Sequence, residues 1–324
     1  MLGAMAGIAV IGAGAVGGYY GALLARAGHD VRFLMRSDLA AVRERGLDVR
    51  SFRGDFHVAP VQAFATAEEI GPVDWAICSL KATSLDESRT LLAPCVGEGT
   101  RVLALMNGLG IEESFAEWAG GRRVFGGMAF VCINRGEAGV IHHLEYGRVS
   151  IGHFEDDPGE LALLSQLLES GGIEVTVAPN LRYARWEKLC WNIPFNGLSV
   201  AAGGVGTRAI VEDPELRATA ERAMREVVAI ANADLAAAGS DARLTEGAVV
   251  GWMFAQTDTM GDYRTSMVID YVAGRPLEVE SILGEPLRRA AALGVAAPTI
   301  ATLYSLVRAA ELRRQGVIVA IPRG

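Results

Sequence analysis

A lysine and two asparagines, Lys188, Asn192 and Asn196, are spaced by four residues in the second half of the chain. On an α-helix this spacing places them on one ridge, because each step of four residues rotates by only about 40°. Asparagine is unfavourable inside a helix, since its side chain competes for backbone hydrogen bonds. A solvent-exposed polar face is the alternative, but such faces usually carry Glu, Lys and Arg. The pattern therefore favours a site where an ammonium gives a proton to a substrate held by neutral hydrogen bonds.

A second motif lies near the start of the chain, where Gly12, Gly14 and Gly17 form the pattern G-x-G-x-x-G. The short apolar run before it is typical of a buried strand, and the run Tyr19–Ala27, closed by Gly28, is typical of a helix. Together they form the dinucleotide-binding fingerprint, in which phosphates bind at the helix N-terminus. An ordinary βα turn that happens to contain glycines is the weaker explanation, because the context is right on both sides.

Three polar residues stand where further strands of this first half should end. Arg36 occupies the place where an NAD-specific site usually has a carboxylate for the ribose 2′-hydroxyl, and a guanidinium there suits a 2′-phosphate. We therefore expect NADP, although Asp38, two residues later, keeps NAD open and Arg36 alone is also typical of a solvated surface. Lys81 and Asn107 directly follow two more apolar strands. Taken singly they suit a loop and a turn, but together at strand ends they indicate ligand contact.

The elements that must position these residues alternate between strand and helix through the first half. This alternation predicts an α/β fold with a Rossmann-type, doubly wound parallel sheet and a ligand at the carboxyl ends of its strands. Shorter apolar segments over 126–152 indicate closing strands, antiparallel ones among them. The expected strands are 8–11, 31–35, 58–61, 73–80 and 102–106, and the expected helices are 38–45, 84–92 and 111–119.

From about residue 180 the pattern becomes helical, so we expect a Rossmann domain over 1–179 and an all-helical domain over 180–324. The segment 182–202 carries the lysine–asparagine ridge, and Pro194 predicts a kink because proline removes a helical hydrogen bond. Later in this half, Ser266 stands one helical turn before Asp270, and Glu278 stands at an expected helix start. A Glu in that place is often merely favourable to the helix dipole.

Composition narrows the class of protein further. The chain has 324 residues, 51% of them hydrophobic, which is enough for two domains with their own cores. A net charge of −8 argues against a nucleic-acid partner, and no apolar stretch approaches the roughly 20 residues that span a membrane. The four cysteines are scattered, which predicts buried thiols in a reducing cytoplasm rather than disulfides or a metal site. The apolar helices can cover each other or a second copy, so a homodimer stays open.

On the basis of these motifs, the chain resembles the ketopantoate reductase family (2-dehydropantoate 2-reductases) over nearly its whole length. The segment Lys188-Leu189 with Asn192 and Asn196 is similar to the family's K-L-x-x-N-x-x-x-N signature, and Ser266 and Glu278 match its serine and glutamate. The residues that look like the family's NADPH contacts are Gly12, Ala13, Gly14, Ala15, Val16, Gly17, Arg36, Lys81 and Asn107.

The resemblance implies an enzyme of pantothenate biosynthesis that reduces 2-dehydropantoate to pantoate with NADPH. It assigns Lys188 as the catalytic acid, Glu278 as the group that orients the substrate hydroxyl or the lysine, and Asn192, Asn196 and Ser266 as substrate-binding residues. The segment 201–207 lacks the further asparagine that relatives often use for substrate. Two alternatives therefore remain, a reductase of another 2-oxo acid and a non-catalytic NADP sensor. A histidine-dependent dehydrogenase is disfavoured, because all five histidines fall in the first half.

Overall fold

The computed structural model describes residues 5–318, so the outermost residues of both expected domains, 1–4 and 319–324, lie outside it. The chain divides into two compact units. The first, which we call the sheet unit, ends at Met106, resumes at Ile111 and ends at Ala184. The second, the helical unit, takes Asn107–Gly110 and the chain from Arg185 onward.

Within the described residues, the strands of the sheet unit form one ten-stranded sheet in the order β4-β3-β9-β8-β7-β6-β1-β2-β5, with β10 beside β9. The strands around β1 are parallel, and the long pair β8 and β9 is antiparallel. Both features are as predicted. The strands are β1 Gly7–Ile11, β2 Asp30–Leu34, β3 Leu47–Ser51, β4 Phe56–Val58, β5 Gln62–Phe64, β6 Val73–Cys78, β7 Val96–Ala104, β8 Val124–Arg135, β9 Val140–His153 and β10 Val175–Val177.

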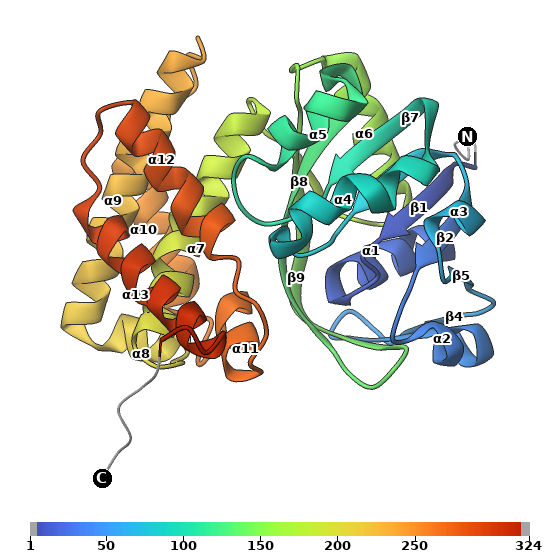
Figure 1. Ribbon diagram of the computed structural model, residues 1–324, viewed down its shortest axis with the longest axis horizontal. Helices are drawn as coiled ribbons and strands as arrows, with labels where there is room; N and C mark the ends of the chain where they lie inside the picture. The colour runs from blue at the N-terminus through green and yellow to red at the C-terminus, as the bar shows by residue number, and fades with distance from the viewer. Residues whose placement is uncertain (1–4, 319–324) are drawn as a thin grey trace. The chain divides into compact units, whose positions relative to one another are not determined.

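Helices cover both faces of this sheet (Figure 1). Because successive strand residues point to opposite faces, Ile8 and Val10 of β1 pack in a core with α1 and α6, whereas Ala9 and Ile11 pack in another with α4 and α5. All four are fully buried, which is why this short strand is apolar throughout. The helices are α1 Ala15–Arg26, α2 Leu39–Arg45, α3 Ala67–Ile70, α4 Leu85–Leu92, α5 Ile111–Ala119 and α6 Pro158–Ser170.

Two sequence-based expectations for this unit were wrong in detail. Of the expected strand at 58–61, only Val58 is in a strand, as the last residue of β4; the rest is the turn before β5, which contains the cis peptide bond Ala59–Pro60. Proline cannot donate to a strand ladder. The strands β3, β5 and β10 were missed; β3 alternates buried Leu47 and Val49 with more exposed residues. Helix α1 begins at Ala15, four residues before the predicted Tyr19, because the glycine-rich turn already belongs to its first turn.

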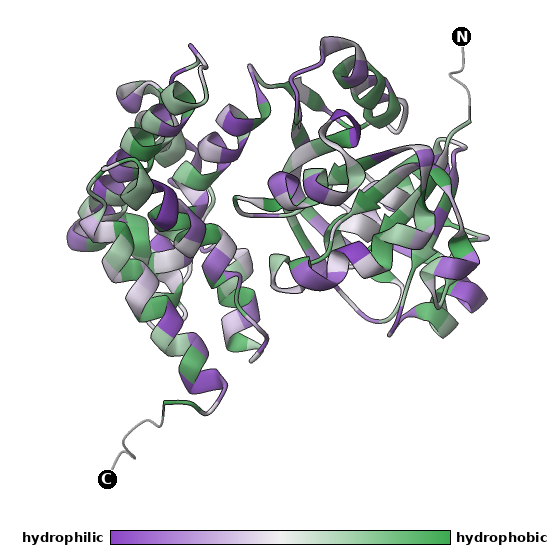
Figure 2. Ribbon diagram, turned by 45° about the horizontal axis from the view of Figure 1, so that its top comes forward, coloured by the Kyte–Doolittle hydropathy of each residue, from purple (hydrophilic) through white to green (hydrophobic). Residues whose placement is uncertain are grey.

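The helical unit begins with α7, Leu181–Ala201, whose first residues lie in the sheet unit and which runs through Pro194 as one helix. Along these helices hydrophilic and hydrophobic residues alternate (Figure 2), as expected of helices with one buried face. Among the described helices, none is long and apolar enough to cross a membrane. The remaining elements are α8 Thr207–Glu212, α9 Pro214–Ala237, α10 Glu246–Thr257, α11 Ser266–Val272, the π-helix Glu280–Gly284, α12 Glu285–Ala292 and α13 Pro298–Arg314.

Candidate cofactor and substrate sites

The three glycines after β1 have three different surroundings. Gly12 has a φ of +92°, and a Cβ there would lie 2.7 Å from the backbone nitrogen of Leu80. A Cβ on Gly17 would overlap the Ser79 side chain and lie 2.6 Å from the Gly12 oxygen. A Cβ on Gly14 would meet no atom closer than 4.0 Å. The chain's own packing therefore requires glycine at the first and third positions, while the second leaves its backbone open to a ligand.

The N-terminus of α1 is also free to receive an anion. Gly14 is its N-cap, no side chain caps it, and its first turn carries no acidic residue. Ala13, Ala15 and Val16 are only partly buried. Backbone N–H groups at such a terminus lack intrahelical partners and, with the helix dipole, favour a phosphate. The residues present at this turn thus fit the pyrophosphate of a dinucleotide.

Arg36, which favours NADP, and Asp38, which would favour NAD, have different surroundings. Arg36 is exposed and has no hydrogen bond or ion pair among the described residues. The Asp38 carboxylate accepts hydrogen bonds from the Arg135 guanidinium at 2.5 Å, the Ser37 hydroxyl at 2.9 Å and the Gly139 backbone N–H at 3.3 Å. Desolvation raises the pKa of Asp38, but these hydrogen bonds outweigh it and hold that pKa below its ordinary value. Arg36 remains available to a ligand, and Asp38 is already engaged.

Lys81 lies close in the chain to the residues that support the glycine turn. It is exposed at the carboxyl end of β6, directly after Leu80. Ser79, two residues earlier, donates its hydroxyl hydrogen to the Gly12 carbonyl at 2.9 Å. Because β6 also pairs with β1, the sheet brings the end of β6 and the glycine turn together.

Asn107 lies in the loop after β7, and this loop belongs to the helical unit. The Leu109 N–H donates to the Ser281 carbonyl at 2.9 Å. Gly108 has a φ of +106°, and a Cβ there would lie 2.7 Å from Ser281 Oγ. The loop is therefore seated on the π-helix that follows Glu278. This contact has no signal in residue spacing, since the two segments lie far apart in the chain.

The ridge on α7 is buried at its two asparagines and half-buried at its lysine. Asn192 is 4% exposed and Asn196 is fully buried, which excludes a solvent-exposed polar face for both asparagines, and Lys188 is half-buried. The Asn196 side-chain oxygen accepts a hydrogen bond from the Met267 N–H at 3.0 Å. Its Nδ2 has no hydrogen-bond partner among the described residues, although it is buried. An unpaired buried donor costs free energy unless a ligand satisfies it.

Ser266 and Glu278 are both placed by contacts within the helical unit. Ser266 is the first residue of α11, whose N-cap Thr265 accepts from the Val268 N–H. Met267, the residue after Ser266, donates its backbone N–H to the Asn196 side-chain oxygen, so the start of α11 adjoins the α7 ridge. Glu278 is 4% exposed and stands two residues before the π-helix. Short π-helices frequently mark functional sites.

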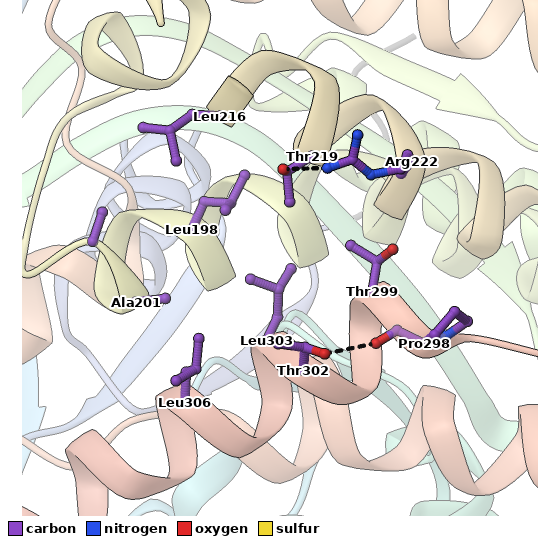
Figure 3. A pocket seen from close by; sticks show the side chains of 11 residues that line it. Leu198, Ala201, Leu216, Thr219, Arg222, Pro298, Thr299, Thr302, Leu303 and Leu306 are labelled. Atoms are coloured by element: carbon purple, nitrogen blue, oxygen red, sulfur yellow. Dashed lines mark hydrogen bonds between the residues drawn. The ribbon is translucent and has the colours of Figure 1, made fainter. Parts of the chain in front are cut away.

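An apolar groove of the helical unit lies apart from these residues. It runs among α7, α9 and α13 (Figure 3), and its polar side chains bond locally, Thr302 to the Pro298 carbonyl and Arg222 to Thr219. No candidate catalytic residue lines it. The lining residues are Leu198, Ala201, Ala202, Leu216, Thr219, Arg222, Pro298, Thr299, Thr302, Leu303 and Leu306.

The four cysteines are buried thiols, as predicted. Burial raises the pKa of Cys78 to about 12 and that of Cys95 to about 11, so neither is a reactive thiolate near neutral pH. Within residues 5–318, no three His, Cys, Asp or Glu side chains are grouped so that they could hold a metal ion.

A Rossmann-type sheet with an open glycine turn, followed by a helical unit with a buried lysine–asparagine ridge, is the architecture of a dinucleotide-dependent oxidoreductase. Residues 8–156 match the family described as Ketopantoate reductase PanE/ApbA, and residues 180–311 match its C-terminal domain family. The chain belongs to the ketopantoate reductase family.

Known relatives agree over almost the full chain. A 2-dehydropantoate 2-reductase from Nostoc sp. is 39% identical over 302 residues, which cover 91% of this chain and 92% of the relative. The structure of a 2-dehydropantoate 2-reductase from Geobacter metallireducens matches with a TM-score of 0.90 at 42% identity, covering 94% of this chain and 99% of that one. The corresponding structure from Methylococcus capsulatus gives 0.84 at 34% identity, covering 95% and 97%.

Proposed function

We propose that the protein reduces the ketone of 2-dehydropantoate to the hydroxyl of pantoate with NADPH. The observation that carries the proposal is the buried ridge of α7, where a lysine and two asparagines offer hydrogen-bond donors in an apolar setting. The Nostoc and Geobacter relatives named as 2-dehydropantoate 2-reductases support this choice of substrate.

The cofactor is assigned to the domain of residues 1–179 and the substrate to residues 180–324. NADPH supplies the hydride when bound. The glycine turn holds its pyrophosphate through backbone N–H groups, Arg36 binds the 2′-phosphate, and Lys81 and Asn107 contact it further along. The full set is Gly12, Ala13, Gly14, Ala15, Val16, Gly17, Arg36, Lys81 and Asn107.

The substrate's ketone oxygen gains negative charge as its carbon is reduced. The Lys188 ammonium stabilises that charge and gives the oxygen a proton, and solvent then returns a proton to the amine. Asn196 donates from its unpaired Nδ2, and Asn192 and Ser266 add neutral hydrogen bonds to the substrate carboxylate and hydroxyl. Glu278 orients the substrate hydroxyl or the lysine.

The test is oxidation of NADPH at 340 nm across a panel of 2-oxo acids that includes 2-dehydropantoate, with NADH beside it. We expect the highest kcat/KM with 2-dehydropantoate and NADPH. A higher kcat/KM with another 2-oxo acid would give the alternative reductase, and no turnover with any would give the NADP sensor.

Replacing the proton donor tests the mechanism. Lys188→Ala should lower kcat by about 10²–10⁴-fold, the usual contribution of a positioned acid, and leave the dissociation constant of NADPH nearly unchanged. Glu187→Gln, at the neighbouring position off the ridge, is the matched control and should retain activity. A Lys188→Ala enzyme with kcat near wild type would remove the lysine from this role.

We further propose that the protein acts as a homodimer in the cytoplasm. A Staphylococcus aureus structure titled as a dimeric ketopantoate reductase shares this fold at 22% identity, with a TM-score of 0.78. The four buried thiols suit a reducing compartment. Sedimentation equilibrium of the purified protein tests the dimer, and cell fractionation tests the compartment; a monomer at micromolar concentration would refute the first.

A further inference from the structure

The end of β2 presents an electrostatic conflict. Arg36 suits a 2′-phosphate, but Asp38 is a carboxylate only two residues away in the chain. A carboxylate in this region normally accepts a hydrogen bond from the ribose 2′-hydroxyl of NAD, and it repels a phosphate. A site with both residues should discriminate poorly between the two cofactors unless the carboxylate is neutralised.

The structure shows what neutralises it. Arg135, the last residue of β8, lies 97 positions further along the chain, and its guanidinium donates to Asp38 at 2.5 Å and to the Ser37 hydroxyl at 3.0 Å. The Gly139 N–H, from the turn between β8 and β9, donates to the other carboxylate oxygen. The Asp38 side chain is only 16% exposed, whereas that of Arg135 is 48% exposed. The carboxylate is therefore covered, and the cation faces solvent next to the residue that follows Arg36.

We propose that Arg135 is a specificity-determining residue for NADP over NAD. Its guanidinium forms an ion pair with the Asp38 carboxylate. The end of β2 therefore keeps a net positive charge from Arg36, and the carboxylate cannot accept a hydrogen bond from a 2′-hydroxyl. Without Arg135, the charges of Arg36 and Asp38 cancel. The inference rests on the proposed binding of the 2′-phosphate at Arg36, and it adds that the β8–β9 turn sets the selectivity of that site.

The test compares binding of 2′,5′-ADP and 5′-AMP, which differ only in the 2′-phosphate, by calorimetry at one fixed ionic strength. Arg135→Gln should weaken 2′,5′-ADP about tenfold, the scale of one hydrogen-bonded charge, and leave 5′-AMP within about twofold. Adding Asp38→Asn should restore most of the lost affinity, because the uncovered charge is then gone. The ratio of kcat/KM for NADPH to that for NADH should change in the same order.

Arg45→Gln is the matched control. Arg45 also donates to this turn, at the Ala138 carbonyl, but it has no hydrogen bond to Asp38, so its removal should leave the binding ratio unchanged. Arg135→Lys keeps the charge and should keep the preference. If Arg135→Gln does not fold, Arg135→Met takes its place, because it also removes the charge but keeps the aliphatic stem.

The outcomes distinguish a wrong role for Arg135 from a wrong placement of the 2′-phosphate. An unchanged ratio in Arg135→Gln, or a failure of Asp38→Asn to restore it, overturns the role of Arg135, and a loss of the ratio in Arg135→Lys overturns its explanation by charge alone. A ratio unaffected by Arg36→Gln instead overturns the placement of the 2′-phosphate. The choice of 2-oxo acid is independent of both results.

Discussion

Asn196→Ala separates what the α7 ridge does for stability from what it does for the substrate. The wild-type side chain makes one hydrogen bond, to the Met267 N–H at 3.0 Å, and buries one Nδ2 that has no partner among the described residues. Removing the bond leaves that N–H unpaired, at about 1–3 kcal/mol. The variant also removes the unpaired Nδ2, and the free-energy cost of burying that donor, which is of similar size, is then gone. The two effects nearly cancel, so we expect the free energy of unfolding to fall by no more than about 2 kcal/mol.

The loss of kcat/KM should correspond to a larger free energy than the loss of stability, because no compensating gain accompanies the lost hydrogen bond to substrate. A hydrogen bond to a charged substrate group contributes about 1.5–3 kcal/mol, which corresponds to about a 10–150-fold loss of kcat/KM for 2-dehydropantoate. Urea denaturation measures the first quantity and initial rates measure the second.

Ser199→Ala is the matched control for this variant. Ser199 lies on the same helix, is fully buried, and its hydroxyl likewise has no hydrogen-bond partner in the described part of the chain. It has no proposed contact with substrate, so its removal should leave the kinetics unchanged and the stability equal or higher. If Asn196→Ala kept kcat/KM within about threefold of wild type, its Nδ2 would be a buried orphan like the Ser199 hydroxyl, and the substrate assignment would be wrong.

The remaining predictions concern the glycine turn and acid stability. Gly17→Ala should destabilise the fold by about 1–3 kcal/mol through overpacking and weaken NADPH binding, whereas Gly14→Ala, with open space around its Cβ, should weaken binding with little change in Tm; equal loss of Tm in both would contradict this. The Arg101 hydrogen bond lowers the pKa of Glu160 against a smaller effect of desolvation. Its stabilisation is thus present above the ordinary glutamate pKa and is lost as pH falls through the lowered one. Glu160→Gln should be less stable than wild type at pH 7 by up to about 1 kcal/mol, with the difference vanishing in acid; a difference that persisted at low pH would refute the pairing.

Local patterns predicted the parts of the fold that depend on local physics. The apolar β1 followed by the glycine turn specifies a buried strand and an open helix N-terminus, and the spacing of Lys188 and Asn196 specifies one face of α7. The strand expected at 58–61 failed because apolar residues there flank Pro60, which belongs to a turn. The pairing of Arg135 with Asp38 was not predictable, since it depends on which strands of a ten-stranded sheet become neighbours.

The loop that carries Asn107 shows how a long-range contact follows from a local defect. At the end of the π-helix before α12, the Glu285 N–H donates to the Glu280 carbonyl, five residues back. In this register the Ser281 carbonyl would accept from residue 286, which is Pro286 and has no N–H. The Leu109 N–H fills that vacant acceptor, and Gly108, lacking a Cβ, lets the loop approach closely enough. Asn107 is thereby tied to the π-helix that begins two residues after Glu278, so contacts within the helical unit fix the loop that carries Asn107.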